Sequence, residues 1–463
     1  MPAQPDRRFL ASAIVGVAFF MHGLDSTIVS TALPHMAVAF GVNPVRLDIT
    51  IVAYMLSMAV FVPVSGWIAD RFGAAVIFAA AIGLFTLGSL ICGISNGLVT
   101  MTAARVVQGL GAAMIIPVGR LVVLNSVDKS DYIRAMVIVS LFPTAGIMLG
   151  PPVGGFISTY VSWRWIFLIN LPVGALGIVM VWRYIENYRA LERRHLDWTG
   201  FVLTGITLSA LLYGFEGIGR SGADTHLMAA LLGGGLIAGF FAIRHARKSP
   251  NSLLDLSLLQ IETLRKNATG GSLFRVSAGA VPFLMPLLFQ IPFGKSAFDS
   301  GLLTLSIGAG ILSVRMFAER LLKTFGFRRS LVVNSGLLAI GFVLCTLLTP
   351  STPGFLIVPL LFACGVAQGF QYTSLNALSV ADVPRTRLSA ATSLTQLCQQ
   401  LSHAVGVAVA ASLLHVGMFL RDAEVVARSD FVIAFLALAV LDLCALWTFW
   451  TMAPNAGAEI TKR

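Results

Sequence analysis

Long apolar segments recur along almost the whole of this sequence, and they constrain its fold more than any other feature. A helix needs about 20 apolar residues to cross the hydrocarbon core of a bilayer. We predict fourteen such segments, at 9–30, 47–68, 75–95, 99–126, 134–158, 165–183, 198–217, 226–244, 270–291, 298–319, 330–350, 354–377, 388–418 and 430–453. The sequence therefore predicts an all-α integral membrane protein with 14 transmembrane helices.

The composition excludes the main alternatives to a membrane protein. Only 11% of the residues are charged, whereas soluble domains carry about 25%, and a chain that is 57% hydrophobic is not intrinsically disordered. The five cysteines form no C-x-x-C pair, so we expect no disulfide framework, no metal site and no cofactor. The sequence has no H-E-x-x-H, no G-x-S-x-G and no phosphate-binding glycine loop, so we do not expect an enzyme.

The distribution of basic residues predicts the orientation. If the N-terminus is cytoplasmic, 22 of the 32 Lys and Arg residues fall in cytoplasmic segments and 6 in external loops. Such a bias follows the positive-inside rule. It also accounts for the net charge of +11 without nucleic acid. We expect both termini in the cytoplasm and the first segment to be an uncleaved anchor.

A similar charged turn occurs twice in the sequence and divides the predicted helices into two halves. Gly66–Gly73 follows the second segment, and a similar charged turn from Glu319 to Arg329 follows the tenth. We therefore predict a six-helix bundle over residues 1–185, a linker with two inserted transmembrane helices over 186–268, and a second six-helix bundle over 269–463. Repeated halves are how many secondary transporters are built, with the substrate site near the middle of the membrane.

Motifs along the first half resemble those of a known family. They are Leu24–Val29 with Ala32–Pro34, Gly66–Gly73, Arg105–Gly109, Gly146 with Gly150–Gly155, Trp163–Phe167, and Asn170–Gly174. In this order and at these segments they resemble the major facilitator superfamily, and within it the 14-span drug:proton antiporter branch of the EmrB/QacA type. The sequence departs from the family pattern at Ala74-Ala75, where basic residues usually follow the second motif.

The resemblance implies a fold, a function and a location. The fold is the major facilitator fold, with two six-helix bundles and two inserted helices, in a bacterial inner membrane. The function is proton-coupled antiport that exports small lipophilic or amphipathic compounds by alternating access. The partners are the substrate, protons and the lipid bilayer; some relatives use a periplasmic adaptor, which nothing in the sequence requires. An exporter of a specific metabolite or organic anion on the same fold is an alternative, and a membrane-embedded sensor or enzyme is a remote one.

Three residues are candidates for proton coupling. Asp25 is a carboxylate within the first segment, about five residues from its outer end, and Arg105 is about six residues inside the fourth. Removal from water favours the protonated carboxyl, and a nearby cation favours the carboxylate. We expect Arg105 to tune Asp25, and His22 lies on the same helical face as Asp25. The alternatives are a static ion pair and a packing histidine.

A second set of residues is expected to act in gating. At the cytoplasmic turn these are Gly66, Asp70, Arg71 and Gly73, and in the fifth segment they are Gly146, Gly150, Pro151, Gly154 and Gly155. Glycines let helices approach closely and prolines bend them. The alternatives are a solvated turn and packing without a role in direction.

Polar residues of the second half are candidates for a substrate cavity. They are Arg275, Gln371, Gln396, Gln400 and His403. A charge within a span is costly unless it faces a cavity or a partner, so Arg275 either attracts an anionic substrate or forms a structural ion pair. The glutamines and His403 either line a pore or hold helices together. The sequence assigns no role to Asp442 or Arg315.

Overall fold

The computed structural model describes residues 7–127, 132–187, 196–216, 225–249, 255–314, 317–384, 387–454 and 456–457. These residues form helices, turns and loops, and they contain no strand, so the predicted all-helical membrane class is confirmed. Twelve of the described helices are long and apolar enough to cross a membrane. The other two predicted segments correspond to shorter apolar helices, Trp198–Gly214 and Ala297–Ser313, so fourteen crossings are not confirmed.

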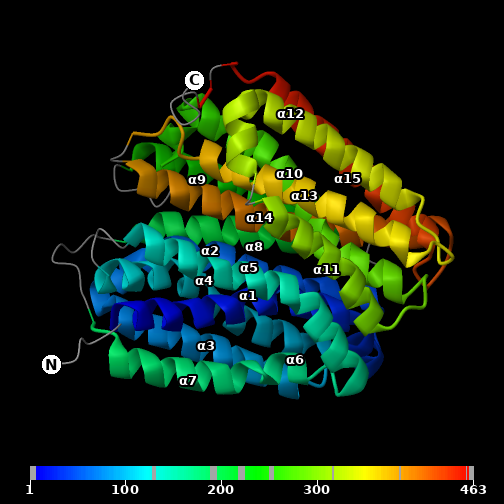
Figure 1. Ribbon diagram of the computed structural model, residues 1–463, viewed down its shortest axis with the longest axis horizontal. Helices are drawn as coiled ribbons and strands as arrows, with labels where there is room; N and C mark the ends of the chain where they lie inside the picture. The colour runs from blue at the N-terminus through cyan, green and yellow to red at the C-terminus, as the bar shows by residue number, and fades with distance from the viewer. Residues whose placement is uncertain are drawn as a thin grey trace. The chain divides into compact units, whose positions relative to one another are not determined.

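The chain divides into two compact units, each with its own set of helices. The first unit comprises Met1–Val42 and Ile49–Leu196, and the second comprises Asn43–Asp48 and Asp197–Arg463. The helices of the first unit are α1 (Arg7–Phe40), α2 (Asp48–Phe72), α3 (Ala74–Ile94), α4 (Leu98–Ser126), α5 (Tyr132–Tyr160), α6 (Trp165–Leu168) and α7 (Asn170–Tyr184) (Figure 1). Within this unit α1 packs on α5, α3 packs on α4, and α7 packs on α3.

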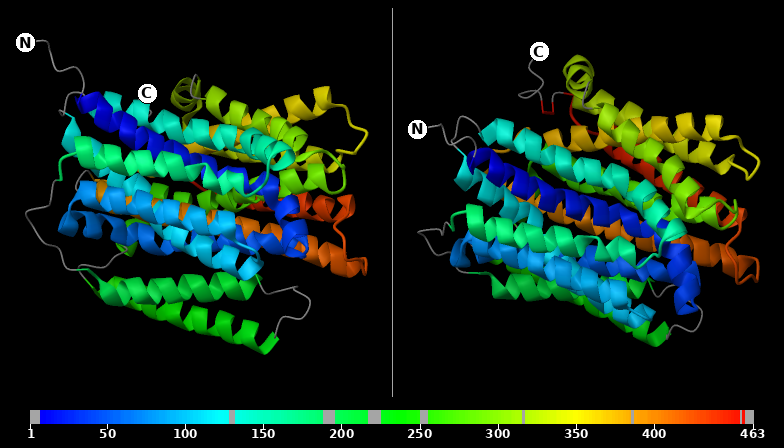
Figure 2. Two further views of the ribbon diagram at one scale, coloured as in Figure 1. Left: turned by 90° about the horizontal axis from the view of Figure 1, so that it is seen from below. Right: turned by 60° about the horizontal axis from the view of Figure 1, so that its bottom comes forward.

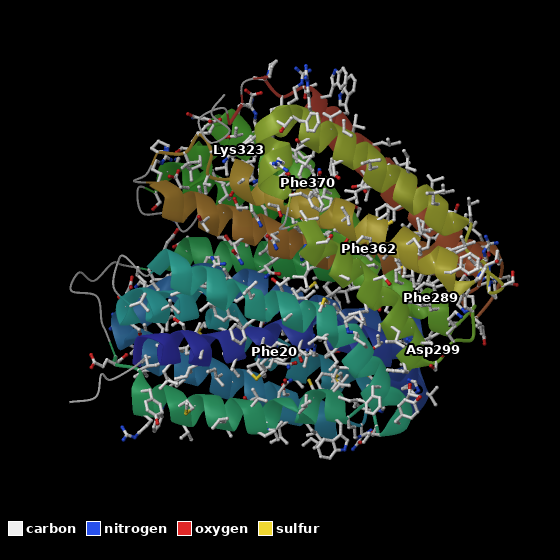
Figure 3. The ribbon with its side chains drawn as sticks, in the orientation of Figure 1. Phe20, Phe289, Asp299, Lys323, Phe362 and Phe370 are labelled. Atoms are coloured by element: carbon white, nitrogen blue, oxygen red, sulfur yellow. The ribbon has the colours of Figure 1, made fainter. Side chains whose placement is uncertain are left out.

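The glycines of the fifth segment bring α5 against α1. Gly146, Gly150 and Gly154 recur every fourth residue and therefore lie on one face of α5. A Cβ on Gly146 would lie 2.5 Å from the carbonyl oxygen of Phe20 on α1 (Phe20 is labelled in Figure 3), and a Cβ on Gly154 would lie 2.5 Å from that of Ile28. The two backbones are thus in direct contact, as in the small-residue helix interfaces of membrane proteins.

Pro151 leaves a backbone carbonyl of α5 without its usual hydrogen-bond donor, and a side chain of α1 supplies one. A proline in a helix lacks the N–H that would bond the carbonyl four residues earlier, which here is the carbonyl of Ile147. The hydroxyl of Thr27 on α1 donates to that oxygen at 3.1 Å. A free carbonyl inside a bilayer is costly, so this bond satisfies the oxygen and joins α5 to α1.

The second unit contains the remaining helices. They are α8 (Trp198–Glu216), α9 (Thr225–Lys248), α10 (Glu262–Gln290), α11 (Ala297–Ser313), α12 (Ala318–Thr346), α13 (Gly354–Leu378), α14 (Leu388–Leu420) and α15 (Arg428–Trp450), with the 3₁₀ helices η1 (Pro44–Leu47) and η2 (Leu256–Gln260). α10 packs on α14, α11 on α13, and α12 on both α15 and α13. α8 and α9 lie side by side as an antiparallel pair (Figure 2).

Two expectations about helix ends were wrong. The first helix does not end at residue 30 but continues through Pro34 to Phe40, which membrane helices tolerate when the freed backbone group is satisfied. The expected turn from Glu319 to Arg329 is helical on both sides of a bend at Gly326, whose φ of 73° and ψ of 169° are not helical. A positive φ of this kind strongly favours glycine, and at the motif turn of the first unit Gly73 has a φ of 102°.

The glycine contact between α1 and α5 generates a prediction about stability. We expect Gly154→Ala to lower the free energy of unfolding by about 1–3 kcal/mol, the usual cost of overpacking, because its Cβ would meet backbone on α1. Gly234→Ala on α9 is the matched control, since nothing lies within 4 Å of its Cβ position. Thermal unfolding of both variants in detergent measures the difference, and equal stability of the two would contradict the close contact.

Candidate functional site

A buried ion pair lies at the centre of the first unit. Asp25 on α1 and Arg105 on α4 are 0% and 1% exposed, and Arg105 Nη1 donates to Asp25 Oδ2 at 2.8 Å. The expected neighbourhood of these two residues is therefore found. The expected depth of Asp25 was wrong, because α1 continues to Phe40 and Asp25 lies 15 residues before the helix end.

Gln108 connects both members of the pair. It follows Arg105 by three residues and therefore lies on the same face of α4. Its amide nitrogen donates to Asp25 Oδ1 at 2.8 Å, and its amide oxygen accepts from Arg105 Nη1 at 2.6 Å. The second N–H of the amide reaches Ser89 Oγ on α3 at 2.7 Å, and Asn170 of α7 donates to the same oxygen. Four helices thus share one polar network.

Arg105 is also held by α2. Its Nε donates to the carbonyl oxygen of Thr50 at 3.3 Å, and its guanidinium carbon lies 4.1 Å from the centre of the Tyr54 ring. The Tyr54 hydroxyl is 3.0 Å from Nδ1 of His22, the third expected proton-coupling residue. His22 therefore joins the cluster through Tyr54.

This arrangement gives Arg105 a second acceptor. Both oxygens of the Asp25 carboxyl accept hydrogen bonds, one from the guanidinium of Arg105 and one from the amide of Gln108. If Asp25 took up a proton, the charge attraction to Arg105 would disappear, while the oxygen of Gln108 and the carbonyl of Thr50 would still accept from the guanidinium. Arg105 therefore has acceptors besides the carboxyl, one on its own helix and one on α2.

The second unit has a different buried cluster, around Arg275 on α10. Arg275 is 0% exposed, and its side chain folds back along its own helix to Asn267, donating to the side-chain oxygen at 2.8 Å and to the carbonyl at 3.2 Å. Within the described part of the chain, Nε of Arg275 has no hydrogen-bond partner. No carboxylate of the described residues forms an ion pair with it.

The other expected cavity residues lie on α13 and α14. His403 Nε2 is 2.8 Å from the hydroxyl of Tyr372, and Gln396 and Gln400 are half-buried on α14 with His403. Gln371 is 0% exposed and bonds Asn334 and Ser335 of α12 through its amide. For Gln371 these contacts favour the alternative role, that of a tie between helices.

Asp442 on α15 is a carboxyl that the sequence left without a role. It is 0% exposed and accepts from the hydroxyl of Ser277 on α10 at 2.8 Å. Among the described residues its second oxygen, Oδ2, has no hydrogen-bond partner. The second unit thus buries a cation and an acid that each keep one polar atom without a partner among the described residues.

The expected gating residues lie in two places. On α5, Gly146, Gly150 and Gly154 contact α1, Pro151 lies within the helix and Gly155 is buried. At the turn between α2 and α3, Asp70 and Arg71 are exposed, and Arg71 lies over the rings of Trp67 and Phe72. Gly66 has open space around its Cβ position.

Asn187, which follows α7, is a contact of this turn that the sequence did not indicate. Its side-chain oxygen accepts from the N–H of Val76 at 3.4 Å, and its nitrogen donates to the carbonyl of Phe72 at 3.3 Å. A Cβ on Gly73 would lie 2.1 Å from that side-chain oxygen. The glycine is therefore required both by its backbone and by this neighbour.

Several residues of these clusters were missed for identifiable reasons. Gln108 lay within a quoted motif, and its spacing from Arg105 was a usable signal. Asn170 also lay within a quoted motif, but nothing in the sequence linked it to the pair. Ser89 and Tyr54 carry no signal, because only the packing of α2 and α3 brings them there. Arg315 lies outside the described residues. Among the described residues, no group of three His, Cys, Asp or Glu side chains could hold a metal ion.

Comparison with known proteins places this chain in a family. A family model described as "Major Facilitator Superfamily" matches residues 15–407. The chain belongs to the Major Facilitator Superfamily. The family resemblance indicated by the sequence motifs is therefore confirmed, and the chain is a membrane transporter and not an enzyme.

Relatives and solved structures agree with this assignment. The chain is 39% identical over 406 residues to a protein of Pectobacterium carotovorum named "Putative multidrug resistance protein MdtD", covering 88% of this chain and 86% of that protein. It is 38% identical over 423 residues to a protein of the same name from Salmonella heidelberg, covering 90% and 88%. A POT family transporter structure superposes with a TM-score of 0.70 at 14% identity over 95% of this chain and 96% of that one. A D-xylose-proton symporter structure does so with a TM-score of 0.68 at 14% identity, covering 98% and 99%. These structures share the fold.

The buried pair generates a prediction about energetic coupling. Removal of one member of a buried pair leaves an uncompensated charge and costs about 3–5 kcal/mol. We expect Arg105→Gln alone to destabilise the protein on this scale, and the double variant Asp25→Asn/Arg105→Gln to be more stable than Arg105→Gln. A double-mutant cycle by thermal unfolding in detergent measures this coupling. Simple additivity of the two single effects would argue against a direct interaction.

Proposed function

We propose that this transporter is a proton-coupled antiporter that exports small lipophilic or amphipathic compounds by alternating access. The observation that carries the proposal is the fully buried Asp25–Arg105–Gln108 network, in which both carboxyl oxygens accept hydrogen bonds and Arg105 has acceptors besides the carboxyl. The relatives whose names describe multidrug resistance support the substrate class. Asp25, Arg105 and His22 are the proposed proton-coupling residues.

The proposed coupling step is a change of partners for Arg105. With Asp25 charged, Arg105 is held between α1 and α4 by an attraction that is strong because no water screens it. A proton on Asp25 removes that attraction, and Arg105 then depends on Gln108 and on the carbonyl of Thr50. Because a ligand shifts an equilibrium only by its differential affinity for the two states, the proton favours the conformation in which Asp25 and Arg105 are separated.

The glycine and proline residues of α5 support a role in gating. Gly146, Gly150 and Gly154 let α5 contact the backbone of α1 next to Asp25. We infer that a movement at the proton site is transmitted directly between α1 and α5, because no side chain separates their backbones at these glycines. We assign the same class of role to Gly66, Asp70, Arg71 and Gly73 at the turn between α2 and α3, and to Pro151 and Gly155 on α5.

We further propose that α8 and α11 also cross the bilayer, which gives fourteen crossings. α8 has 19 residues and α11 has 17; at about 1.5 Å per residue they approach the thickness of the hydrocarbon core. An even number of crossings agrees with two cytoplasmic termini, as the charge bias predicts. In this scheme residues 1–185 and 269–463 are the two six-helix bundles and 186–268 is the inserted segment, in a bacterial inner membrane.

A second candidate function is the export of an organic anion. The observation that favours it is the unsatisfied Nε of the buried Arg275, which has no acidic partner among the described residues. A buried cation of this kind attracts an anionic group and disfavours a cationic one. The proposed lining of the substrate cavity consists of Arg275, His403, Gln396 and Gln400. Gln371 is a further candidate, although its contacts favour a tie between helices.

Proton coupling is tested by neutralising Asp25. In inverted membrane vesicles with an imposed pH gradient, we expect Asp25→Asn to lose gradient-driven accumulation of a fluorescent lipophilic cation, because the variant has no carboxyl to exchange protons. Exchange of labelled for unlabelled compound without a gradient should persist. Asp422→Asn is the matched control, since Asp422 is exposed and asparagine also tolerates its positive φ. Full gradient-driven transport by Asp25→Asn would refute the coupling role.

The charge of the substrate separates the two candidate functions. If the exporter acts on lipophilic cations, Arg275→Gln should retain transport of the cation, because the variant removes a repelling charge. If the physiological cargo is an organic anion, wild-type vesicles should accumulate an anionic dye and Arg275→Gln should lose it. Parallel uptake of one cationic and one anionic fluorescent compound decides between these outcomes, with Arg247→Gln, an exposed basic residue of α9, as the control for overall charge.

A further inference from the structure

A pocket of about 1140 Å³ lies in the second unit beside the bend of α12. We call it the α12 pocket. Its lining comes from α12, from α13 and from the end of α15, and includes none of the proposed proton-coupling or cavity residues. Figure 3 labels Lys323, which precedes the bend, and Phe370, which lies on α13. The function proposed above gives this pocket no role.

The apolar side of the pocket is continuous with an exposed face of α12. Val333 and Leu337 line the pocket and are 63% and 54% exposed, and Ile340 continues the same face and is 56% exposed. In a helix that spans a membrane, a stripe of exposed apolar side chains contacts lipid chains, because no other apolar medium is available to it. The pocket therefore opens toward the hydrocarbon.

The polar side of the pocket is basic. Lys323, Arg328 and Arg329 contribute to the lining, and the described lining residues include no Asp or Glu. The hydroxyl of Ser330 also lies at the pocket; it is buried and has no hydrogen-bond partner within the described part of the chain. The two neighbouring guanidinium groups of Arg328 and Arg329 favour an anion with several oxygens, as arginine does for phosphate.

The bend at Gly326 is what brings these donors together. Lys323 lies in the helical segment before the bend, and Arg328 and Arg329 lie after it. The guanidinium of Arg328 is 5.6 Å from the centre of the Trp450 ring at the end of α15. Tryptophan and basic residues are typical of the level of the membrane at which headgroups lie, so this end of the pocket is at the interface.

We propose that the α12 pocket binds one anionic phospholipid of the cytoplasmic leaflet. The phosphate accepts from Arg328 and Arg329, and an acyl chain lies along Val333 and Leu337. The assignment to the cytoplasmic leaflet follows from the positive-inside bias, which places Lys323 to Arg329 inside. Basic pockets between membrane helices on this side are suited to anionic headgroups. The proposal does not depend on proton coupling or on the identity of the exported compound.

Native mass spectrometry of the delipidated full-length protein, titrated with phosphatidylglycerol or phosphatidylcholine, tests the proposal. We expect one phosphatidylglycerol to bind more tightly than phosphatidylcholine. We expect Arg328→Gln/Arg329→Gln to weaken that binding by about ten-fold or more, because two basic contacts are lost. Arg247→Gln/Lys248→Gln at the end of α9 is the matched control, because it removes the same charge from exposed positions outside the pocket.

A second variant tests whether phosphatidylglycerol binding requires the pocket itself or only its surface charge. Val333→Trp fills the pocket without changing charge, and because Val333 is exposed we expect the protein to fold normally and to lose phosphatidylglycerol binding. Unchanged binding by Val333→Trp, or an equal loss in the α9 control, would show attraction by surface charge alone and overturn the proposal. Displacement of the lipid by inorganic phosphate would identify a site for free anions and would also overturn it.

Discussion

Asp25 and Arg105 are both shielded from water in helices that stand in hydrocarbon, so each charge is tolerated there because of the other. That condition fixes much of the first unit. α1 must lie beside α4 for the pair to form, α3 and α7 must bring Ser89 and Asn170 to the amide of Gln108, and α2 must cover the guanidinium with Tyr54. The surrounding helices pack through glycines, which leaves the ion pair as a polar centre within an otherwise apolar bundle.

The two units treat their buried charges differently. In the first, the acid and the base are paired, and the amide of Gln108 bonds both the second carboxyl oxygen and the guanidinium. In the second, Arg275 and Asp442 are bound by neutral groups, and each keeps an atom without a partner among the described residues. A satisfied network gives a defined resting state, whereas an unsatisfied buried cation is costly and calls for a counter-charge. This asymmetry is why we assign coupling to one unit and substrate contact to the other.

The sequence was sufficient for the helical class, for the family and for the proximity of Asp25 and Arg105, because a charge in a span must find a partner. It was not sufficient where several helices meet. Tyr54 and Ser89 are ordinary residues on their own helices, and like Asn170 they become part of the cluster only through packing. Helix ends were also predicted wrongly. Pro34 does not end α1, and the charged stretch around Gly326 is helical on both sides of a bend. The lengths of α8 and α11 leave the number of crossings as a prediction.

The bond from Thr27 to the carbonyl that Pro151 frees has a consequence for how related sequences can diverge. As long as position 151 is proline, position 27 needs a hydroxyl, because an aliphatic side chain there would leave the carbonyl oxygen of Ile147 without a hydrogen-bond donor inside the membrane. A chain that regains an N–H at 151 no longer has this need, and its residue 27 is free to become apolar. Among descendants of this gene, the two positions should therefore change together, although 124 residues separate them in the chain.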